Sequence, residues 1–131
     1  MKYLFDYTSE QQTKLMDDNG AFFAFSIEQL NEHKKEGVAY VSMGQGLIAP
    51  QSNAEHLHDE LDSIIKKGIK QDIAENGIKA IIHRELGNHE AHITGCVDNT
   101  AVALADYGIT RLQVSVEFGA YFQHCVENDL F

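Results

Sequence analysis

Three capping boxes constrain the fold of this chain most, because each one marks the residue at which a helix begins. In a capping box a Ser or Thr side chain accepts a hydrogen bond from a backbone N–H of the first turn, and a Glu or Gln three residues later reciprocates. The boxes open at Ser26, Ser52 and Thr110. They predict three helices: residues 27–36, a long helix that continues to about Ile73, and a helix from Thr110 to Cys125.

Two further helices and three strands follow from local patterns. The helices are predicted at Ser9–Asp18 and Asp98–Tyr107, where Asn19-Gly20 and Gly108 provide stop signals. Short apolar or β-branched segments bounded by Gly or by a helix start predict strands at Ala21–Phe25, Val38–Met43 and Ile78–His83. The expected fold class is α+β, with a small sheet of about three short strands packed with four to five helices in a single domain.

Residues 111–118 fit two kinds of secondary structure. Apolar and polar residues alternate from Leu112 to Phe118, as they do in a half-buried strand. The capping box at Thr110 favours a helix instead, and apolar residues continue at helical spacing past the alternating stretch, at Tyr121 and Cys125. We therefore predict a helix here.

Length and cysteine content bound the class of protein. A chain of 131 residues with 44% hydrophobic residues is long enough to close one core, so a single globular domain is predicted over residues 1–131. Cys96 and Cys125 form no C-x-x-C pair, which favours free thiols in a reducing, cytoplasmic setting. An acidic residue, Asp6, comes near the N-terminus before any long apolar stretch develops. No apolar run elsewhere approaches the roughly 18 residues of a membrane span. Neither export nor membrane insertion is expected.

The charge of the chain is strongly negative and unevenly distributed. The chain has 20 acidic and 10 basic side chains; residues 1–33 contain six acids and two lysines, and residues 80–131 contain seven acids and two arginines. Such a surface disfavours direct contact with nucleic-acid phosphates or anionic lipid and steers the protein toward basic partners. We therefore expect an acidic, non-catalytic protein-binding domain whose partner has a basic surface.

The predicted partner-binding residues lie in the first turns of the long helix. They are acidic residues that follow Ser52: Glu55, Asp59, Glu60 and Asp62. Acids at this end also favour the positive end of the helix dipole, so the ordinary interpretation is a solvated helix face. The functional interpretation is a surface that complements a basic groove.

A cluster of histidines and acids supports an alternative function. His83, His89, Glu90 and His92 fall within ten residues, and imidazole with carboxylate is a competent ligand set for zinc or another divalent metal. His89 and His92 are three residues apart, whereas the H-E-x-x-H metalloprotease pattern requires four. The alternative is thus a metal-dependent enzyme or a metal-binding protein; the competing interpretation is surface and capping residues. No nucleophile motif accompanies the cluster.

Four aromatic residues in the first third of the chain are predicted to lie in the core. They are Phe22, Phe23, Phe25 and Tyr40. A small α+β domain needs large apolar side chains where its sheet meets a helix, so a core position is preferred to an interface.

The C-terminal third carries a resemblance to a known group of proteins. The Asn88-His89-Glu90 trio, the predicted helix that begins at Asp98 and the segment Asp106–Thr110 follow one another. In this order they resemble small uncharacterised phage and mobile-element proteins with an Asn-His-Glu motif, over about the last 50 residues. The resemblance implies binding to a host protein, including an anti-defence role against nucleases whose DNA-binding grooves are basic. It assigns no catalytic or ligand role to the trio.

Overall fold

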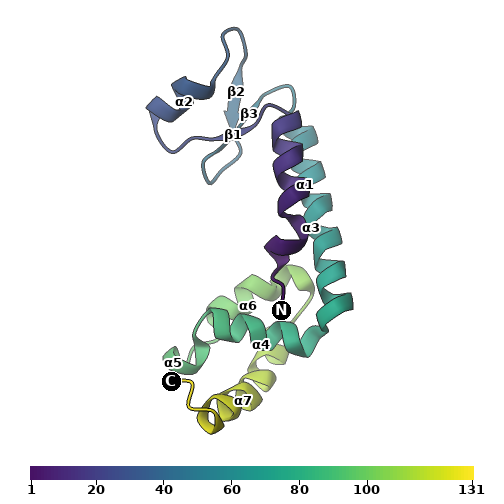
Figure 1. The fold of residues 1–131 in the computed structure, drawn as a ribbon, viewed down its shortest axis with the longest axis vertical. Helices are drawn as coiled ribbons and strands as arrows, with labels where there is room; N and C mark the ends of the chain where they lie inside the picture. Colours follow the sequence, from purple (N-terminus) through teal and green to yellow (C-terminus); the bar gives the residue numbers. More distant parts are fainter. The chain divides into compact units, whose positions relative to one another are not determined.

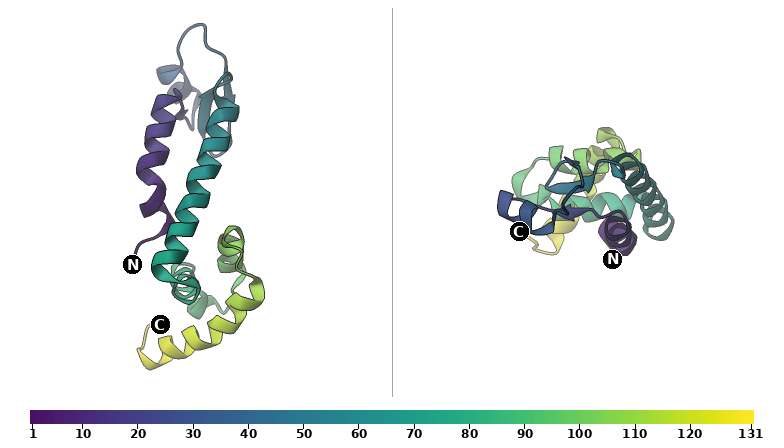
Figure 2. Two further views of the ribbon diagram at one scale, coloured as in Figure 1. Left: turned by 90° about the vertical axis from the view of Figure 1, so that its right-hand side faces the viewer. Right: turned by 90° about the horizontal axis from the view of Figure 1, so that it is seen from above.

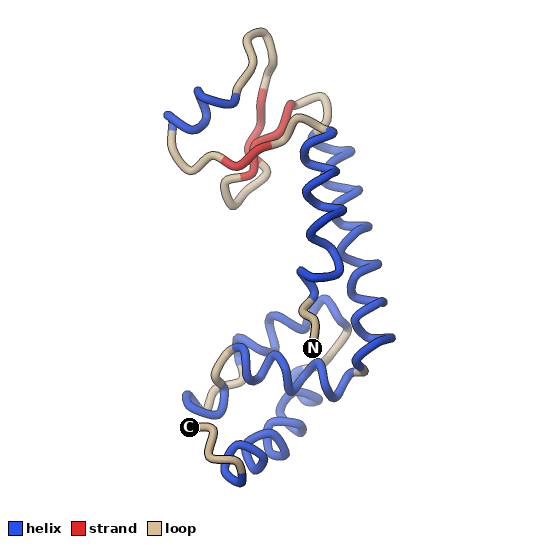
Figure 3. The backbone as a smooth tube through the Cα atoms, viewed as in Figure 1, coloured by secondary structure: helices blue, strands red, loops and turns tan.

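A computed structural model describes residues 1–131 and divides the chain into two compact units. We call Lys2–Lys70 the N-terminal unit, and Gln71–Phe131 together with Met1 the C-terminal unit. Seven α-helices and one three-stranded antiparallel sheet confirm the predicted α+β class, with more helices than the four to five expected (Figure 1). All three strands lie between residues 22 and 50 (Figure 3). The prediction of one domain stays a prediction, because compactness alone does not decide whether the units fold independently.

The N-terminal unit combines the sheet with two long helices and one short helix. Its elements are α1 (Leu4–Asp18), β1 (Phe22–Phe23), α2 (Ile27–His33), β2 (Tyr40–Ser42), β3 (Leu47–Pro50) and the first part of α3 (Ala54–Asn76). The strand order is β1-β3-β2, and both pairings are antiparallel. Phe23 pairs with Leu47, and Val41 pairs with Ala49. The central strand β3 is the one that the sequence patterns missed.

The core of this unit lies between β3 and α3. Ala49 and Leu57 are fully buried there, and Leu61 packs against the same cluster. Helix α1 runs beside the portion of α3 that belongs to this unit (Figure 2). At Gly68 an added Cβ would come within 2.5 Å of the Thr8 side chain, so the glycine permits the close approach of the two helices.

The C-terminal unit is entirely helical. It contains the end of α3, then α4 (Ile78–Asn88), α5 (Ala91–Thr94), α6 (Asp98–Leu104), the 3₁₀ helix η1 (Ala105–Tyr107) and α7 (Arg111–Glu127). Its core joins four of these helices through buried aliphatic side chains: Ile81, Ile82, Leu86, Ala91, Leu104, Ile109 and Val114. The predicted strand at Ile78–His83 is therefore wrong, because these residues form the first turns of α4. Both Ile81 and Ile82 are buried against the core, and a short apolar run of this kind suits a buried helix as well as a strand.

The capping predictions had different outcomes. At Thr110 both hydrogen bonds form: Oγ1 accepts from the backbone N–H of Gln113 at 3.2 Å, and the Gln113 side chain accepts from the backbone N–H of Thr110 at 2.7 Å. The helix predicted for residues 111–118 is thereby confirmed. Ser52 does not cap α3, which begins two residues later, and its hydroxyl donates to the side chain of Asn53.

Helix α1 begins earlier than predicted. Its first residue is Leu4, and the Asp6 carboxylate accepts a hydrogen bond from the backbone N–H of Tyr3 at 2.8 Å. The prediction placed the start at Ser9, but the residue before it, Thr8, is already inside the helix and buried, and its hydroxyl donates to the backbone oxygen of Leu4. A carboxylate three residues after the helix boundary thus provides the local start signal.

Candidate functional site

The four acids predicted to bind a partner are all exposed on α3. Glu55, Asp59 and Asp62 are four and three residues apart, so they project from one side of the helix. Glu60 projects from a different side. The structure therefore groups three of the four predicted residues, and we call Glu55, Asp59 and Asp62 the acidic stripe.

The acidic stripe contains one ion pair with a lysine. Lys66 Nζ lies 2.8 Å from Asp62 Oδ2, one helical turn away. The hydrogen bond and charge of Lys66 lower the pKa of Asp62. The Nδ1 atom of His58 lies 3.5 Å from an oxygen of Asp59, and Glu55 forms no ion pair. Two of the three carboxylates therefore lack a lysine or arginine partner.

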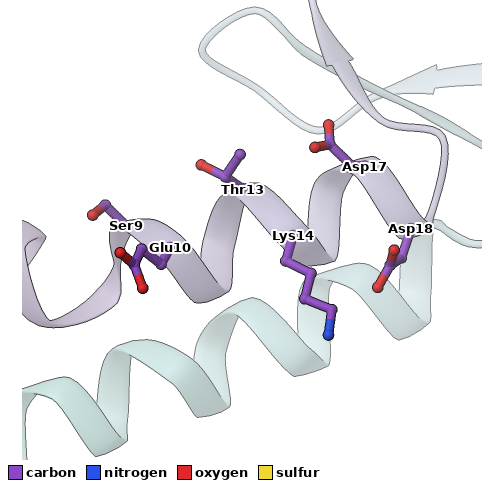
Figure 4. Close-up of a pocket in the computed structure, with 6 residues that line it drawn as sticks. All are labelled: Ser9, Glu10, Thr13, Lys14, Asp17 and Asp18. Carbon is purple, nitrogen blue, oxygen red and sulfur yellow. The ribbon is translucent and has the colours of Figure 1, made fainter.

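Helix α1 adds further exposed carboxylates to the N-terminal unit. A shallow hollow of about 440 Å³ is lined only by polar side chains of this helix, as Figure 4 shows: Ser9, Glu10, Thr13, Lys14, Asp17 and Asp18. Lys14 is the single cation among them. Because one solvated helix face supplies every lining residue, the hollow contributes negative charge but no enclosed site.

The histidines proposed as metal ligands have separate partners. His83 Nε2 lies 2.7 Å from Glu117 Oε2 on α7. His92 Nε2 is 3.1 Å from the backbone oxygen of Leu130. His89 Nε2 makes only an ion-pair contact of 3.6 Å with Glu85 Oε2, and this buried nitrogen has no hydrogen-bond partner. Glu90 is exposed and adopts a left-handed backbone conformation with φ 53°. His83 and His92 both contact the Tyr121 ring, but the four residues do not form a group that could hold a metal ion.

No group of three or more His, Cys, Asp or Glu side chains in the chain has an arrangement that could hold a metal ion. His92 instead packs edge-on against the rings of Tyr121 and Phe131, with centroid distances of 5.6 Å in both cases. His83 also packs edge-on against Tyr121. His83 and His92 therefore have packing roles. Metal binding stays a prediction, because the structure does not bring a set of metal ligands together.

A buried ionic network in the C-terminal unit was missed by the sequence analysis. Asp72 is fully buried, and Arg84 binds it through two hydrogen bonds of 3.0 Å, one to each carboxylate oxygen. The Tyr107 hydroxyl donates to Asp72 at 2.6 Å, and the Asn76 side chain donates at 2.8 Å. Arg84 also donates to Glu85 at 3.0 Å. A carboxylate at position 72, three residues after buried Ile69 on the apolar face of α3, is the signal that could have revealed it.

The protonation states of this network follow from its contacts. Burial raises the pKa of Asp72, but the hydrogen bonds from Arg84, Tyr107 and Asn76 outweigh burial and hold the pKa below its ordinary value. Burial and the acceptor Asp72 raise the pKa of Tyr107 well above its ordinary value. Asp72 is therefore ionised and Tyr107 neutral at pH 7, and the carboxylate is held by the donors around it.

One hollow of about 660 Å³ lies beside this network, at the start of α4. Lys79, His83 and Arg84 supply its basic groups. Arg84 directs two of its nitrogens to Asp72 and a third to Glu85, so its charge is already matched. None of the lining residues is a Ser, Thr or Cys, and the side-chain nitrogens of Lys79 and His83 are the nucleophilic groups of the hollow.

Comparison with known proteins assigns a family to the chain. Residues 4–125 match the model of a family described as a family of unknown function, DUF7659. The chain belongs to the DUF7659 family. No match was found among curated proteins or among solved structures.

The structure of this DUF7659 member settles two further features. No helix has both the length and the apolar character needed to cross a membrane. Both cysteines are free, as predicted: Cys96 is exposed and Cys125 is buried.

Proposed function

We propose that this DUF7659 protein is a non-catalytic binding protein whose partner presents a basic surface. Nucleic-acid-binding proteins and defence nucleases are partners of this kind, because their DNA-binding grooves are basic. The observation that carries the proposal is the exposure of the acidic stripe on α3, where only Asp62 has a lysine partner.

The charge of the C-terminal unit supports the same function. Residues 71–131 contain nine acidic and three basic side chains. Of the three basic ones, Arg84 is buried against Asp72, and Arg111 pairs with Asp98. Lys79 is the only one outside an ion pair. The surface of this unit is consequently acidic, with little positive charge to attract phosphates.

Complementary charge accelerates encounter between partners and makes binding sensitive to salt. Exposed charges separated by more than a Debye length, about 8 Å at physiological salt, are largely screened. The acidic stripe should therefore act mainly on the association rate, and its effect should fade at high salt.

The experiment compares two triple variants that change the net charge equally. Glu55→Gln/Asp59→Asn/Asp62→Asn removes the acidic stripe; Asp106→Asn/Glu127→Gln/Asp129→Asn removes three exposed acids of the C-terminal unit. Each variant removes three negative charges from a net charge of −10. Tagged proteins are used in pull-downs from host lysate with low-salt and high-salt washes, and bound proteins are identified by mass spectrometry.

We expect the wild type and the C-terminal variant to retain a basic protein at low salt and to lose it at high salt. The stripe variant should fail to retain it at either salt concentration, and its association rate with the purified partner should fall. Equal retention by both triple variants would show that the stripe is not the binding surface. Retention of only acidic or neutral proteins by the wild type would contradict the proposed function itself.

The histidine segment does not support a second function. A metal-dependent enzyme would need several ligands around one ion, yet His83 pairs with Glu117 and His92 packs among aromatic rings.

A further inference from the structure

An apolar hollow of about 410 Å³ lies within the N-terminal unit. Helices α1 and α3, strands β1 and β3 and the loop between β2 and β3 supply its lining: Gln12, Met16, Phe23, Met43, Gly44, Gln45, Leu47 and Leu61. No charged side chain lines it, and five of the eight residues are large and apolar. Ligand sites in proteins are typically concave and mostly apolar in this way.

Two exposed phenylalanines extend this surface beyond the hollow. Phe23 and Phe25 were predicted to lie in the core, but they are 50% and 74% exposed. Their rings stack with an interplanar angle of 4° and a centroid distance of 6.3 Å. The Phe25 ring lies so close to Gly46 that an added Cβ would come within 2.3 Å of it. The Phe25 ring is thus packed against the backbone of Gly46 and the ring of Phe23, while much of both side chains remains exposed.

The side chains of the hollow suit a helical partner. Met16 and Met43 are unbranched and polarizable, and methionine side chains adapt to irregular apolar ligands. Aromatic residues and methionine are enriched at protein interfaces, and an exposed aromatic pair beside a pocket is a typical anchor. An amphipathic helix presents apolar residues at i, i+3 or i+4 and i+7, which a groove of this kind accepts.

Charge determines which helix fits. Asp17 on α1 and Glu60 and Asp62 on α3 are exposed carboxylates on the two helices that contribute to the hollow, although none of them lines it. The whole N-terminal unit has eleven acids and seven lysines. A second copy of this chain would bring a further net charge of −10 to the surface and be repelled. A helix with lysines or arginines beside its apolar face would be attracted.

We propose that the apolar hollow and the Phe23–Phe25 pair bind the apolar face of a basic amphipathic helix in a partner protein. This inference deepens the proposed function and rests on it, because exposed acids of α1 and α3 in the same unit would engage the basic residues of the same helix. The hollow adds short-range apolar contact to an encounter that charge alone would leave weak and unspecific.

The first test uses defined peptides. A fluorescein-labelled peptide of about 18 residues, built from Leu and Lys at helical spacing, is titrated with the full chain and followed by fluorescence anisotropy. A peptide with the same composition in shuffled order keeps the charge but has no apolar face. A Leu/Glu peptide keeps the apolar face but reverses the charge. We expect the Leu/Lys peptide to bind, the shuffled peptide to bind at least about tenfold more weakly, and the Leu/Glu peptide not to bind.

Matched variants then locate the binding surface. Met43→Gln keeps an unbranched side chain but removes its apolar character. It should lower the affinity for the Leu/Lys peptide about tenfold at every salt concentration. Met43→Leu preserves apolar volume and should bind like the wild type. Phe25→Ser should weaken binding without disturbing the core. Leu112→Gln, at a side chain 74% exposed in the C-terminal unit, is the control for general apolar stickiness and should have no effect.

The outcomes separate this inference from the proposed function. Two results would refute the proposal that the hollow binds the helix and leave an electrostatic binding surface in place. One is equal binding of the ordered and shuffled peptides; the other is loss of binding in Leu112→Gln but not in Phe25→Ser. Loss of peptide binding in Met43→Gln, with no effect of the acidic-stripe triple variant, would support binding at the hollow and contradict a role of the acidic stripe in binding. Circular dichroism melts accompany each variant; if Met43→Gln is unfolded, Phe25→Ser decides the result.

Discussion

Substitution of Arg84 by methionine tests the buried ionic network most directly. In the wild type the guanidinium donates two hydrogen bonds of 3.0 Å to Asp72, whose side chain has no exposed surface, while that of Arg84 is 4% exposed. Arg84→Met keeps much of the aliphatic volume but leaves a buried carboxylate with only Tyr107 and Asn76 as donors. Removal of one partner from a buried ion pair costs about 3–5 kcal/mol.

The remaining donors offset part of that cost, so we expect a loss of about 3 kcal/mol in the free energy of unfolding. For a chain of this size the loss should lower Tm on the order of 10 °C. Urea denaturation and thermal melts followed by circular dichroism at pH 7 measure both quantities. Asp72→Asn/Arg84→Met removes both charges together and should be less destabilised than Arg84→Met alone, because no unpaired charge stays buried.

The pH dependence provides a second readout. Burial raises the pKa of Asp72, but the hydrogen bonds outweigh it, so the folded-state pKa lies below the unfolded one. This carboxylate therefore contributes stability that is fully present above its unfolded pKa, about 3.9, and is lost as pH falls through the folded pKa. Without Arg84, burial dominates and raises the pKa of Asp72. The destabilisation by Arg84→Met should then be smaller at pH 4 than at pH 7.

Two results would refute this reasoning. One is a loss below about 1 kcal/mol in Arg84→Met, the range of an exposed ion pair. The other is a double variant that is as unstable as the single variant, which would mean that the loss comes from packing and not from an uncompensated charge.

Three other substitutions test local features of the fold. Gly68→Ala gains helix propensity worth about 1 kcal/mol, but the added Cβ would come within 2.5 Å of the Thr8 side chain, and such overpacking costs about 1–3 kcal/mol. We expect urea denaturation to show a lower free energy of unfolding than in the wild type. A higher value would show that α1 can shift away from α3 at no cost. Thr110→Ala removes the cap of α7 and should lower the free energy of unfolding by about 1 kcal/mol. Ser52→Ala should leave Tm unchanged, because Ser52 does not cap α3. Equal effects of the two substitutions on stability would contradict the difference in capping.

Features that depend on near neighbours in sequence were predictable. The helix that starts at Ser26 begins where predicted, and the Ser26 hydroxyl accepts a hydrogen bond from the Gln29 backbone at 3.2 Å. The helix at Thr110 was also correct although residues 111–118 alternate like a strand, because a capping box is formed by residues only three apart. The four acids Glu55, Asp59, Glu60 and Asp62, predicted as one surface in the first turns of the long helix, are all exposed on α3, but Glu60 projects from a different side than the other three.

Errors arose where local patterns were ambiguous. The apolar run at Ile78–His83 suits either a strand or a buried helix, and its environment among α6 and α7 decided for the helix. The strand Leu47–Pro50 was missed because Pro50 interrupts the pattern at its end; as the central strand, it is defined by pairing with β1 and β2 on either side.

The sequence by itself determined the α+β class, most helix positions, the free cysteines and the excess of acids, because propensity, capping and charge are properties of short segments. Only the tertiary structure decided that Asp72 meets Arg84 and Tyr107, which lie 12 and 35 residues away. It also decided that Phe23 and Phe25 face outward beside an apolar hollow. A side chain's exposure depends on which distant segments cover it, and that coverage is set by the packing of the whole unit.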